Sequence, residues 1–415
     1  MIPLVTVYSL LAALVAASAI GVVATRWARD AAVRSNRLDH PDARKVHFAP
    51  TPRVGGVGIA VGIAAGVVGM IVLEVGFGLP LHVASLAPVA LGALVVFALG
   101  LTDDLVGLGF KWRFVVQAGV AWAMTLAGWA VDLSNVPVLE NLSVFQQAAI
   151  SVPLTVMWTV GLINAMNLLD GLDTLAGGTA VIGFIFLALA FTPGGDVTLL
   201  AMCAVGAGAT LGFLTLNRPP ASVFMGDGGS TLLGFLLAMA GIRGVGSMTS
   251  GSLVLVPVIV LGLPILDTVT QMIRRIGEGN SPFLPDRDHL HHRAFDRSGD
   301  VRVAVRKLHL TAVGFGVLAV CLRVVVGMLW AQIGVLAATA VFAYYVVRRL
   351  GYIRTRVVVR NVVVRLRLRA ARRRRLVRKL GLEADVELPG LEAGGDGARD
   401  LDGGAADAAP AVENG

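Results

Sequence analysis

Long apolar runs, interrupted by short polar stretches, follow one another along most of this chain. Each run is roughly 20 residues long, the length that an α-helix needs to cross the hydrocarbon core of a bilayer. We therefore predict an all-α fold, a polytopic bundle of about eleven transmembrane helices. The expected ranges are 3–25, 54–74, 83–101, 114–131, 147–165, 175–192, 198–216, 230–241, 252–273, 306–328 and 331–348.

The charges that flank these runs predict the orientation of the bundle. The first run is too long for the apolar part of a cleaved signal peptide, and its first positive charge, Arg26, follows it. This order predicts an N-terminus outside the cytoplasm and, with eleven spans, a C-terminus inside. All but two of the 35 Lys and Arg, namely Arg243 and Arg323, then lie in or beside cytoplasmic segments. Positive charge is retained on that side, so we predict a multi-pass protein of the plasma membrane.

Composition agrees with this picture and excludes an ordinary soluble domain, because 56% of the residues are hydrophobic and the mean hydropathy is +0.77. Cys203 and Cys321 both lie in apolar runs, so no disulfide framework is predicted. We expect two regions, a membrane domain over residues 1–350 and a cytoplasmic tail over residues 351–415.

The tail begins Arg-rich and ends in a composition typical of disorder. From Arg348 to Lys379 it holds 14 Lys or Arg and no acid, which accounts for much of the net charge of +8. One interpretation is docking on the anionic inner leaflet, at about 1 kcal/mol per basic residue. The other is a stop-transfer flank. We do not expect nucleic-acid binding, because Tyr352 is the only aromatic residue within the run.

Four polar stretches stand at the ends of apolar runs. A carboxylate near the bilayer centre costs roughly 2.5–3.5 kcal/mol, so acids in such places usually have a function. The eleven-span scheme puts all four stretches on the cytoplasmic side, where they can form one acidic site of the magnesium-binding type. The stretches are Thr102–Asp104, Asn164–Asp173, Phe224–Ser230 and Pro285–Arg293.

The first two stretches supply carboxylates and carboxamides. Asp103 and Asp104 are adjacent, so on a helix they point about 100° apart and cannot serve one ligand equally. One would act as a base while the other would support a metal or orient a neighbour, although a solvated helix end would look alike. The second stretch has a polar residue at every third position and forms a ribbon whose oxygens suit Mg²⁺. Its members are Asn164, Asn167, Asp170 and Asp173.

The third and fourth stretches add an acidic turn and an imidazole-rich segment. Asp227 lies in a Gly-Asp-Gly-Gly turn, where backbone N–H groups can approach an anion, but such a turn also occurs without further role. In the fourth stretch an extended strand would place His289, His291 and Arg293 on one side. No cysteine is near to complete a zinc site, so we expect an anionic or hydroxyl-rich ligand, with a merely polar loop as the alternative.

Together these motifs resemble the polyprenyl-phosphate N-acetylhexosamine-1-phosphate transferases, in particular the branch that moves N-acetylglucosamine-1-phosphate from its UDP-sugar to a polyprenyl phosphate. The resemblance runs in order from about Leu38 to Arg293. It also includes the first cytoplasmic loop, whose Pro-x-Pro-Arg-x-Gly-Gly pattern is not explained by positive-inside bias. Its motifs are Arg44-Lys-x-His47, Pro-x-Pro-Arg53-x-Gly-Gly56, Asp103-Asp104, Asn-x-x-Asn-x-x-Asp-Gly-x-Asp173, Phe-Met-Gly-Asp227 and Pro-Phe-x-x-Asp-Arg-x-His-Leu-His-His-Arg293.

The resemblance implies a role for individual positions. Asn167 and Asp227 would hold Mg²⁺, or Mn²⁺ in its place, and Asp103 or Asp104 would be the base toward the lipid phosphate. Asp173 and Phe224 would hold the uracil, the first by hydrogen bonds and the second by stacking. The sugar and the diphosphate would be faced by His289, His291, His292 and Arg293. The remaining positions expected to bind substrate are Lys45, His47, Arg53, Arg113 and Asp170.

Two positions depart from the family pattern. Thr174 stands where the family usually has Gly, which would narrow the uridine pocket. Arg113 stands where many members have Lys, and a phosphate contact survives either way.

Two other functions were weighed against this one. The related phospho-N-acetylmuramoyl-pentapeptide transferases are the nearest alternative, and the His-Leu-His-His-Arg and Arg-Lys-x-His forms favour the N-acetylglucosamine branch. An ion-coupled transporter would need polar residues on both sides of the midplane, whereas here they cluster on one.

The expected substrates are therefore UDP-N-acetylglucosamine and polyprenyl phosphate, in the first lipid-linked step of cell-envelope polysaccharide assembly. Prenyl length, the downstream glycopolymer and the oligomeric state, with a homodimer as one option, are not determined by the sequence.

Overall fold

The computed structural model describes residues 4–40, 50–79, 81–136, 139–246, 251–279 and 289–349. In these ranges the chain is almost entirely helical and forms no strand, apart from one isolated bridge between Asp39 and Thr51. The predicted all-α fold is confirmed, whereas the tail over 351–415 lies outside the described residues. The helices are α1 (Leu4–Arg34), α2 (Gly55–Phe77), η1 (Val83–Leu86), α3 (Ala87–Val106), α4 (Phe110–Leu126), α5 (Val144–Leu169), α6 (Leu175–Phe191), η2 (Thr192–Gly194), α7 (Val197–Leu214), α8 (Gly226–Gly246), η3 (Gly251–Val254), α9 (Leu255–Val260), α10 (Gly262–Glu278), α11 (Leu290–Ser298), α12 (Val301–Val324) and α13 (Leu329–Arg349).

Nine helices within the described ranges are long and apolar enough to cross a membrane, and each coincides with a predicted span. They are α1, α2, η1 with α3, α5, α6 with η2, α7, α8, α12 and α13. Of the other two predicted spans, 114–131 overlaps α4, which has 17 residues, and 252–273 is divided between α9 and α10 at Leu261. The protein is a polytopic helical membrane protein, and the count of eleven stays a prediction.

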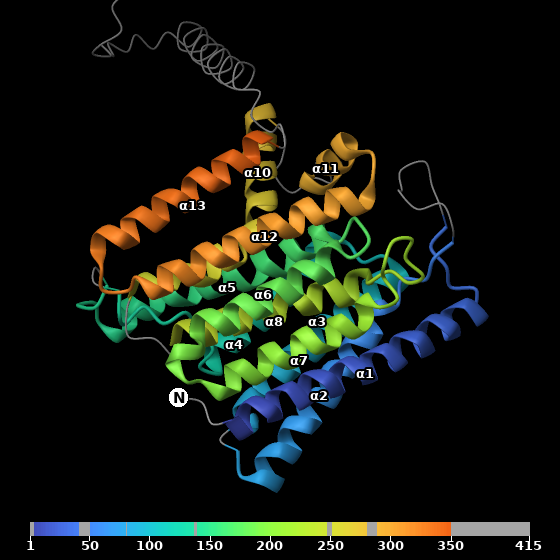
Figure 1. Cartoon of the computed structure of the whole chain (residues 1–415), viewed down its shortest axis with the longest axis horizontal. Helices are drawn as coiled ribbons and strands as arrows, with labels where there is room; N and C mark the ends of the chain where they lie inside the picture. The colour runs from blue at the N-terminus through green and yellow to red at the C-terminus, as the bar shows by residue number, and fades with distance from the viewer. Residues whose placement is uncertain are drawn as a thin grey trace, which may run out of the picture. The chain divides into compact units, whose positions relative to one another are not determined.

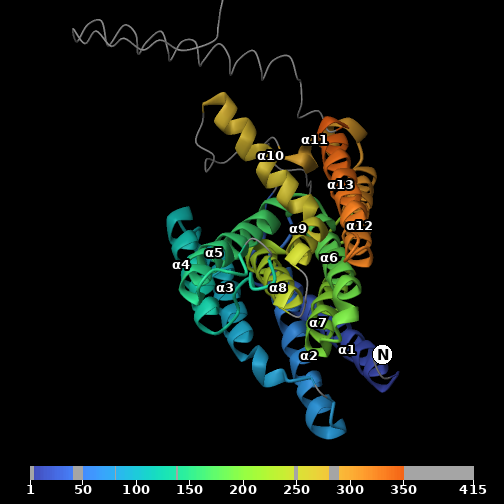
Figure 2. The ribbon, with the colours of Figure 1, turned by 90° about the vertical axis from the view of Figure 1, so that its left-hand side faces the viewer.

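Helix α8 runs through the middle of the bundle in both views (Figures 1 and 2), and it contacts α2, α3, α5, α6, α7 and α9. Most of its residues are buried, because glycines let its neighbours approach closely. A Cβ added to Gly234 would lie 2.7 Å from the Cα of Ile163 on α5. Such small residues provide the packing that holds transmembrane helices together. The start of α8 is therefore fixed against the helices that carry the predicted acids.

The Pro-x-Pro-Arg-x-Gly-Gly pattern is explained by the docking of α2 against the start of α8. The N–H of Gly55 donates to the carbonyl of Phe224 at 2.8 Å, and the N–H of Gly56 donates to that of Met225 at 2.8 Å. A Cβ added to Gly56 would lie 2.4 Å from the backbone N of Gly229. Only glycine permits this approach, so the pattern is a packing motif at the edge of the site.

The histidine-rich stretch is helical. The expected placement of His289, His291 and Arg293 on one side required an extended strand, so this arrangement is not found. Leu290 to Ser298 form α11, and His289 is its N-cap. Consecutive helical residues point about 100° apart. His291 and His292 therefore face different neighbours, which decides what each of them contacts.

Candidate active site

The site is built around the first residues of α8. Gly226 has a φ of +75°, in the left-handed region that favours glycine, and a Cβ there would lie 2.6 Å from a carboxylate oxygen of Asp104. That carboxylate accepts hydrogen bonds from the N–H groups of Asp227 and Gly228, each at 3.0 Å. The first N–H groups of a helix have no partner within it, and a negative charge is favourable there. Asp104, on α3, thus caps α8 and holds Asp227 in place.

Asp103 points to a different partner, as the 100° spacing predicts. Its carboxylate accepts from the N–H of Leu108 at 2.6 Å and from Arg113, which lies on α4 after the turn at Gly107. The same guanidinium nitrogen of Arg113 also donates to Asp227 at 2.9 Å. Asp103 is only 8% exposed at its side chain, against 28% for Asp227, so Asp227 is the more accessible of the two carboxylates that share Arg113.

The polar ribbon at the end of α5 divides into two parts. Asn164 donates to Gln117 at 2.7 Å, away from the pocket, whereas Asn167 donates to Ser230 of α8 at 3.0 Å and is a hydrogen-bonding neighbour of Asp227. Asp170 lies at the pocket wall beyond the end of α5. Burial, followed by the neighbouring charge of Asp227, raises the pKa of Asp170 to about 7.

Asp173 and Thr174 shape the next turn. One carboxylate oxygen of Asp173 accepts from the N–H of Ala221 at 2.9 Å, and the N–H of Thr174 donates to Asn217 at 2.7 Å. Thr174 has a φ of +65°, a left-handed backbone that a β-branched residue rarely adopts. The usual family Gly therefore suits the backbone here. Thr174 lines an adjoining hollow that shares Pro219 and Arg302 with the pocket beside the start of α8, and the narrowing of a uridine site by Thr174 stays a prediction.

A pocket of about 770 Å³ opens beside the start of α8. Among the described residues its walls include five aspartates but only two arginines, so it is acidic. The predicted site residues that line it are Arg53, Asn167, Asp170, Asp173, Phe224, Asp227 and His292. Predicted residues that are not part of its lining are Asp103, Asp104, Arg113, His289, His291 and Arg293, whereas Lys45 and His47 lie outside the described residues.

Several lining residues were not predicted. Asp39 pairs with Arg53 at 3.0 Å, and Arg302 donates to the carbonyl of Pro219 at 2.9 Å. Asp300 and Arg302 lie just before a predicted span, in the charged segment that flanks it. The sequence alone does not distinguish them from other flanking charges. Asn217 follows an apolar run as a single carboxamide, a signal too weak to be recognised alone. The unpredicted lining residues with polar or aromatic side chains are Asp39, Thr51, Asn217, Phe295, Asp300 and Arg302.

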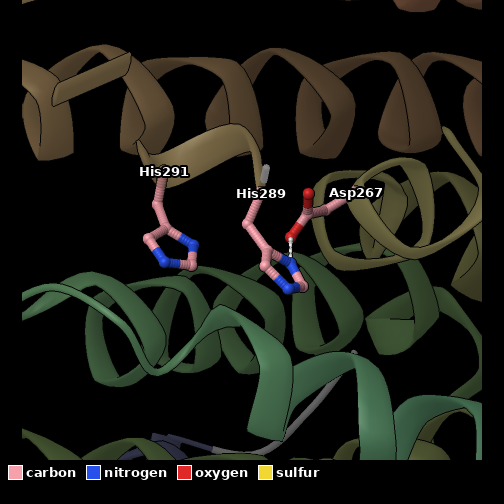
Figure 3. A group of neighbouring side chains, drawn as sticks. All are labelled: Asp267, His289 and His291. Carbon is pink, nitrogen blue, oxygen red and sulfur yellow. Dashed lines mark hydrogen bonds and ion pairs between the residues drawn. The ribbon is translucent and has the colours of Figure 1, made fainter. Parts of the chain in front are cut away.

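The three histidines have different surroundings, and Figure 3 shows two of them, His289 and His291, with Asp267. His289 is 6% exposed and lies against Asp267 and Gln271 of α10. His291 is 3% exposed, and its Nε2 would lie 2.1 Å from a Cβ on Gly171, so its ring is packed against that turn. Burial, and then the charge of His292, lowers the pKa of His291 to about 3, which keeps it neutral at pH 7. Only His292 of the three lines the pocket.

The donor set of the pocket fits a hard cation. Asn167 and Asp227 offer carboxamide and carboxylate oxygens from neighbouring helices, and Asp170 adds a further carboxylate. Oxygen ligands of this kind, with room left for phosphate and water, are those that Mg²⁺ prefers. Arg113 already places one positive charge on Asp227, which indicates that a cation is favoured there. A second group, Asp267 with His289 and His291, has metal-ligand spacing of another kind.

Comparison with known proteins agrees with this class of site. The sequence profile of glycosyl transferase family 4 matches residues 86–245. The chain is 36% identical over 293 residues to a probable undecaprenyl-phosphate N-acetylglucosaminyl 1-phosphate transferase of Bacillus subtilis, covering 70% of this chain and 79% of that protein. It is 34% identical over 320 residues to a decaprenyl-phosphate N-acetylglucosaminephosphotransferase of Mycolicibacterium smegmatis, covering 71% and 77%. For an undecaprenyl-phosphate alpha-N-acetylglucosaminyl 1-phosphate transferase of Escherichia coli the identity is 30% over 272 residues, covering 64% and 71%.

The fold and the site define a membrane-embedded transferase with an acidic pocket. The chain belongs to glycosyl transferase family 4, and the resemblance inferred from its motifs is confirmed for the family and for the branch.

Proposed function

We propose that this protein transfers N-acetylglucosamine-1-phosphate from UDP-N-acetylglucosamine to a polyprenyl phosphate, giving polyprenyl-diphosphate-N-acetylglucosamine and UMP. The observation that carries the proposal is the pairing of Asn167 with Asp227 at the start of α8, on an acid-lined pocket in a chain of this family. Membership of the branch whose relatives bear this activity in their names supports the donor and the acceptor.

In this reaction an oxygen of the lipid phosphate attacks the β-phosphorus of the donor, and the bond from that phosphorus to the oxygen bridging it to the α-phosphate breaks. Asn167 and Asp227 would hold Mg²⁺, with Mn²⁺ able to replace it. When bound, the ion supplies Lewis-acid neutralisation of the diphosphate and of the leaving UMP. The carboxamide and carboxylate are held on separate helices that pack tightly, so the ligand pair is preorganised.

The two adjacent aspartates would divide their work. Asp104 has a carboxylate oxygen on each of two backbone N–H groups, so its task is to orient Asp227. Asp103 is the better base toward the lipid phosphate, because a substrate phosphate can take its place as the acceptor of the Arg113 hydrogen bond and so leave its carboxylate available. Arg113 would then move its charge from the carboxylates to the transferred phosphate.

The remaining pocket residues would bind the nucleotide and the sugar. Phe224 lies in the wall, where it can stack on uracil, and Asp173 lies in the same wall, where its carboxylate can accept a hydrogen bond from the base. His292 and Arg53 supply an imidazole and a positive charge for the sugar and diphosphate. This pocket would face the cytoplasm, where nucleotide sugars are made, with the N-terminus outside and the Arg-rich tail on anionic lipids.

The test uses membranes that contain the full chain and UDP-N-acetylglucosamine radiolabelled in its sugar. Transfer is measured as label in the lipid extracted from these membranes. We expect label in the lipid and release of UMP, loss of both with a chelator, and recovery with Mg²⁺. UDP-N-acetylmuramoyl-pentapeptide serves as the alternative donor, and transfer from it alone would contradict the proposed substrate. Cysteine labelling from outside intact cells at residues 217–225 would contradict the proposed orientation.

A further inference from the structure

Helix α10 buries a polar face and exposes an apolar one. Asp267, Gln271 and Arg275 recur every four residues along one side and are 1%, 4% and 9% exposed. Ile273 and Ile276, by contrast, are each 62% exposed. Polar groups buried in this way cost free energy unless they are hydrogen-bonded, so the inward face of α10 must have a polar partner.

The partner of this face is the start of α11. One carboxylate oxygen of Asp267 accepts the N–H of Leu290 at 2.9 Å and the side-chain N–H of Gln271 at 2.9 Å. The other oxygen lies 3.4 Å from Nδ1 of His289 (Figure 3). The Gln271 amide contacts the same nitrogen. His289 is the N-cap of α11 and makes no side-chain capping bond of its own. Asp267 supplies the missing acceptor from another helix.

The position of α11 determines what its next residues contact. His291 packs on Gly171, where no side chain larger than hydrogen fits, and Gly171 follows the pocket residue Asp170. His292 enters the pocket itself. A rotation or shift of α11 would therefore move both the wall residue His292 and the support behind Asp170.

We propose that Asp267 is a positioning residue of the transfer reaction: by fixing His289 and Leu290 it sets α11 so that His291 braces the Asp170–Gly171 turn and His292 faces the substrate. The inference rests on the proposed function for its kinetic consequences, but not for its structural ones. Misplacement of a binding group by about 1 Å is enough to lower turnover on the order of 100-fold.

A metal site is the rival use of the same side chains. The ligand atoms of Asp267, His289 and His291 lie within 4.8 Å of one another, and Nδ1 of His291 is buried without a hydrogen-bond partner. Asp267 and His289, however, are already engaged with Leu290 and Gln271. These hydrogen bonds favour the positioning role, and the metal becomes an outcome of the test.

The experiment compares full-length variants purified in detergent. Asp267→Ala should lower kcat/KM for the nucleotide sugar about 10- to 100-fold per folded molecule, with a lower kcat as well as a higher KM. Asp267→Asn keeps an oxygen for the Leu290 N–H and should recover part of the loss. Thr268→Ala is the matched control, because the Thr268 hydroxyl donates within its own helix, to the carbonyl of Pro264 at 3.0 Å. It should have wild-type constants.

Hydrogen–deuterium exchange supplies a readout that does not depend on turnover. Asp267→Ala should speed exchange in residues 290–298 and in residues 166–174, whereas Thr268→Ala should change neither. If Asp267→Ala does not accumulate, Asp267→Asn and Gln271→Ala serve in its place, with smaller changes in the same direction.

Two results would overturn the positioning role. One is wild-type kinetics and exchange per folded molecule in the Asp267 variants, with only the amount of protein reduced. The other is one equivalent of zinc in the purified wild type that is lost in both Asp267→Ala and His291→Ala. A wild type that exchanges as expected but transfers no label would instead defeat the proposed function, and the exchange results would still decide the role of Asp267.

Discussion

The two ends of helix α8 both carry charge, and they differ in how that charge is balanced. At the far end Arg243 forms a hydrogen-bonded ion pair with Asp196 at 2.7 Å and lies 5.6 Å from the ring centre of Trp129. Asp196 also caps α7 through the N–H of Leu199 at 3.0 Å. One cation meets one anion there. At the near end Arg113 is shared between Asp103 and Asp227, and acidic residues outnumber arginines around the adjoining pocket.

The difference separates structural charge from functional charge. A matched pair that also caps a helix is fully used by the fold, which explains why Arg243 can stand apart from most of the other basic residues. An excess of partly exposed carboxylates is electrostatically unfavourable, and the fold gains nothing from it unless a cation joins them. The near end is therefore the end where a metal and an anionic substrate fit.

The largest expected effect is at Asp227. Replacing it with Asn removes a hard anionic ligand, so turnover should fall on the order of 10²- to 10³-fold with protein amount little changed. Asn167→Ala should raise the Mg²⁺ concentration for half activity, and the double variant should lose much less than the product of the single losses. Mg²⁺ titrations of transfer in membranes measure this. Unchanged Mg²⁺ dependence in the surviving enzyme would defeat the metal assignment.

A smaller effect is expected at Arg113, which forms an ion pair with Asp227 at 2.9 Å. Arg113→Ala should lower turnover about 10-fold, because the phosphate loses a cation, and should lower the half-saturating Mg²⁺ concentration, because Asp227 loses a competing charge. Arg113→Lys should restore most of the turnover. The same titration distinguishes this from simple unfolding, which would leave the Mg²⁺ requirement of the folded fraction unaltered.

At the far end the expected effect is on stability alone. Arg243→Ala leaves Asp196 without its cation in a partly buried place, and we expect a loss of about 1 kcal/mol in the free energy of unfolding. Thermal unfolding in detergent should show a lower midpoint, while kcat and KM per folded molecule stay at wild-type values. Altered kinetics would show that the two ends are coupled and would undo the comparison.

The smallest expected effect concerns Asp170, whose pKa is raised from 3.8 to about 7 by burial and then by Asp227. The folded protein then binds a proton that the unfolded chain has already released between pH 4 and 7, so stability falls as the pH rises through this window. Asp170→Asn should flatten that dependence in chelator-containing buffer. Unfolding midpoints from pH 5 to 8 measure it, and added Mg²⁺ should stabilise the wild type most at pH 8. Equal slopes in both proteins would contradict the raised pKa.

The sequence alone determined the class of fold, most of the spans and the identity of the chemical groups. Apolar runs of membrane length have few alternative structures, because every buried backbone group must be hydrogen-bonded within a helix. The Asn and Asp repeat at the end of α5 and the turn at Asp227 were recognisable because polar groups at such places are costly. These signals are local, and they survive without knowledge of packing.

Only the tertiary structure decided which of those groups face the pocket. Asp103 and Asp104 look equivalent in sequence, yet one bonds Arg113 and the other caps α8, because their side chains leave α3 in different directions. His289, His291 and His292 likewise divide between α10, the Gly171 turn and the pocket. Asp267 was hidden in an expected span, since its partner lies 23 residues away at Leu290. Contacts between distant segments depend on how helices pack, and that information is not contained in any single stretch of the chain.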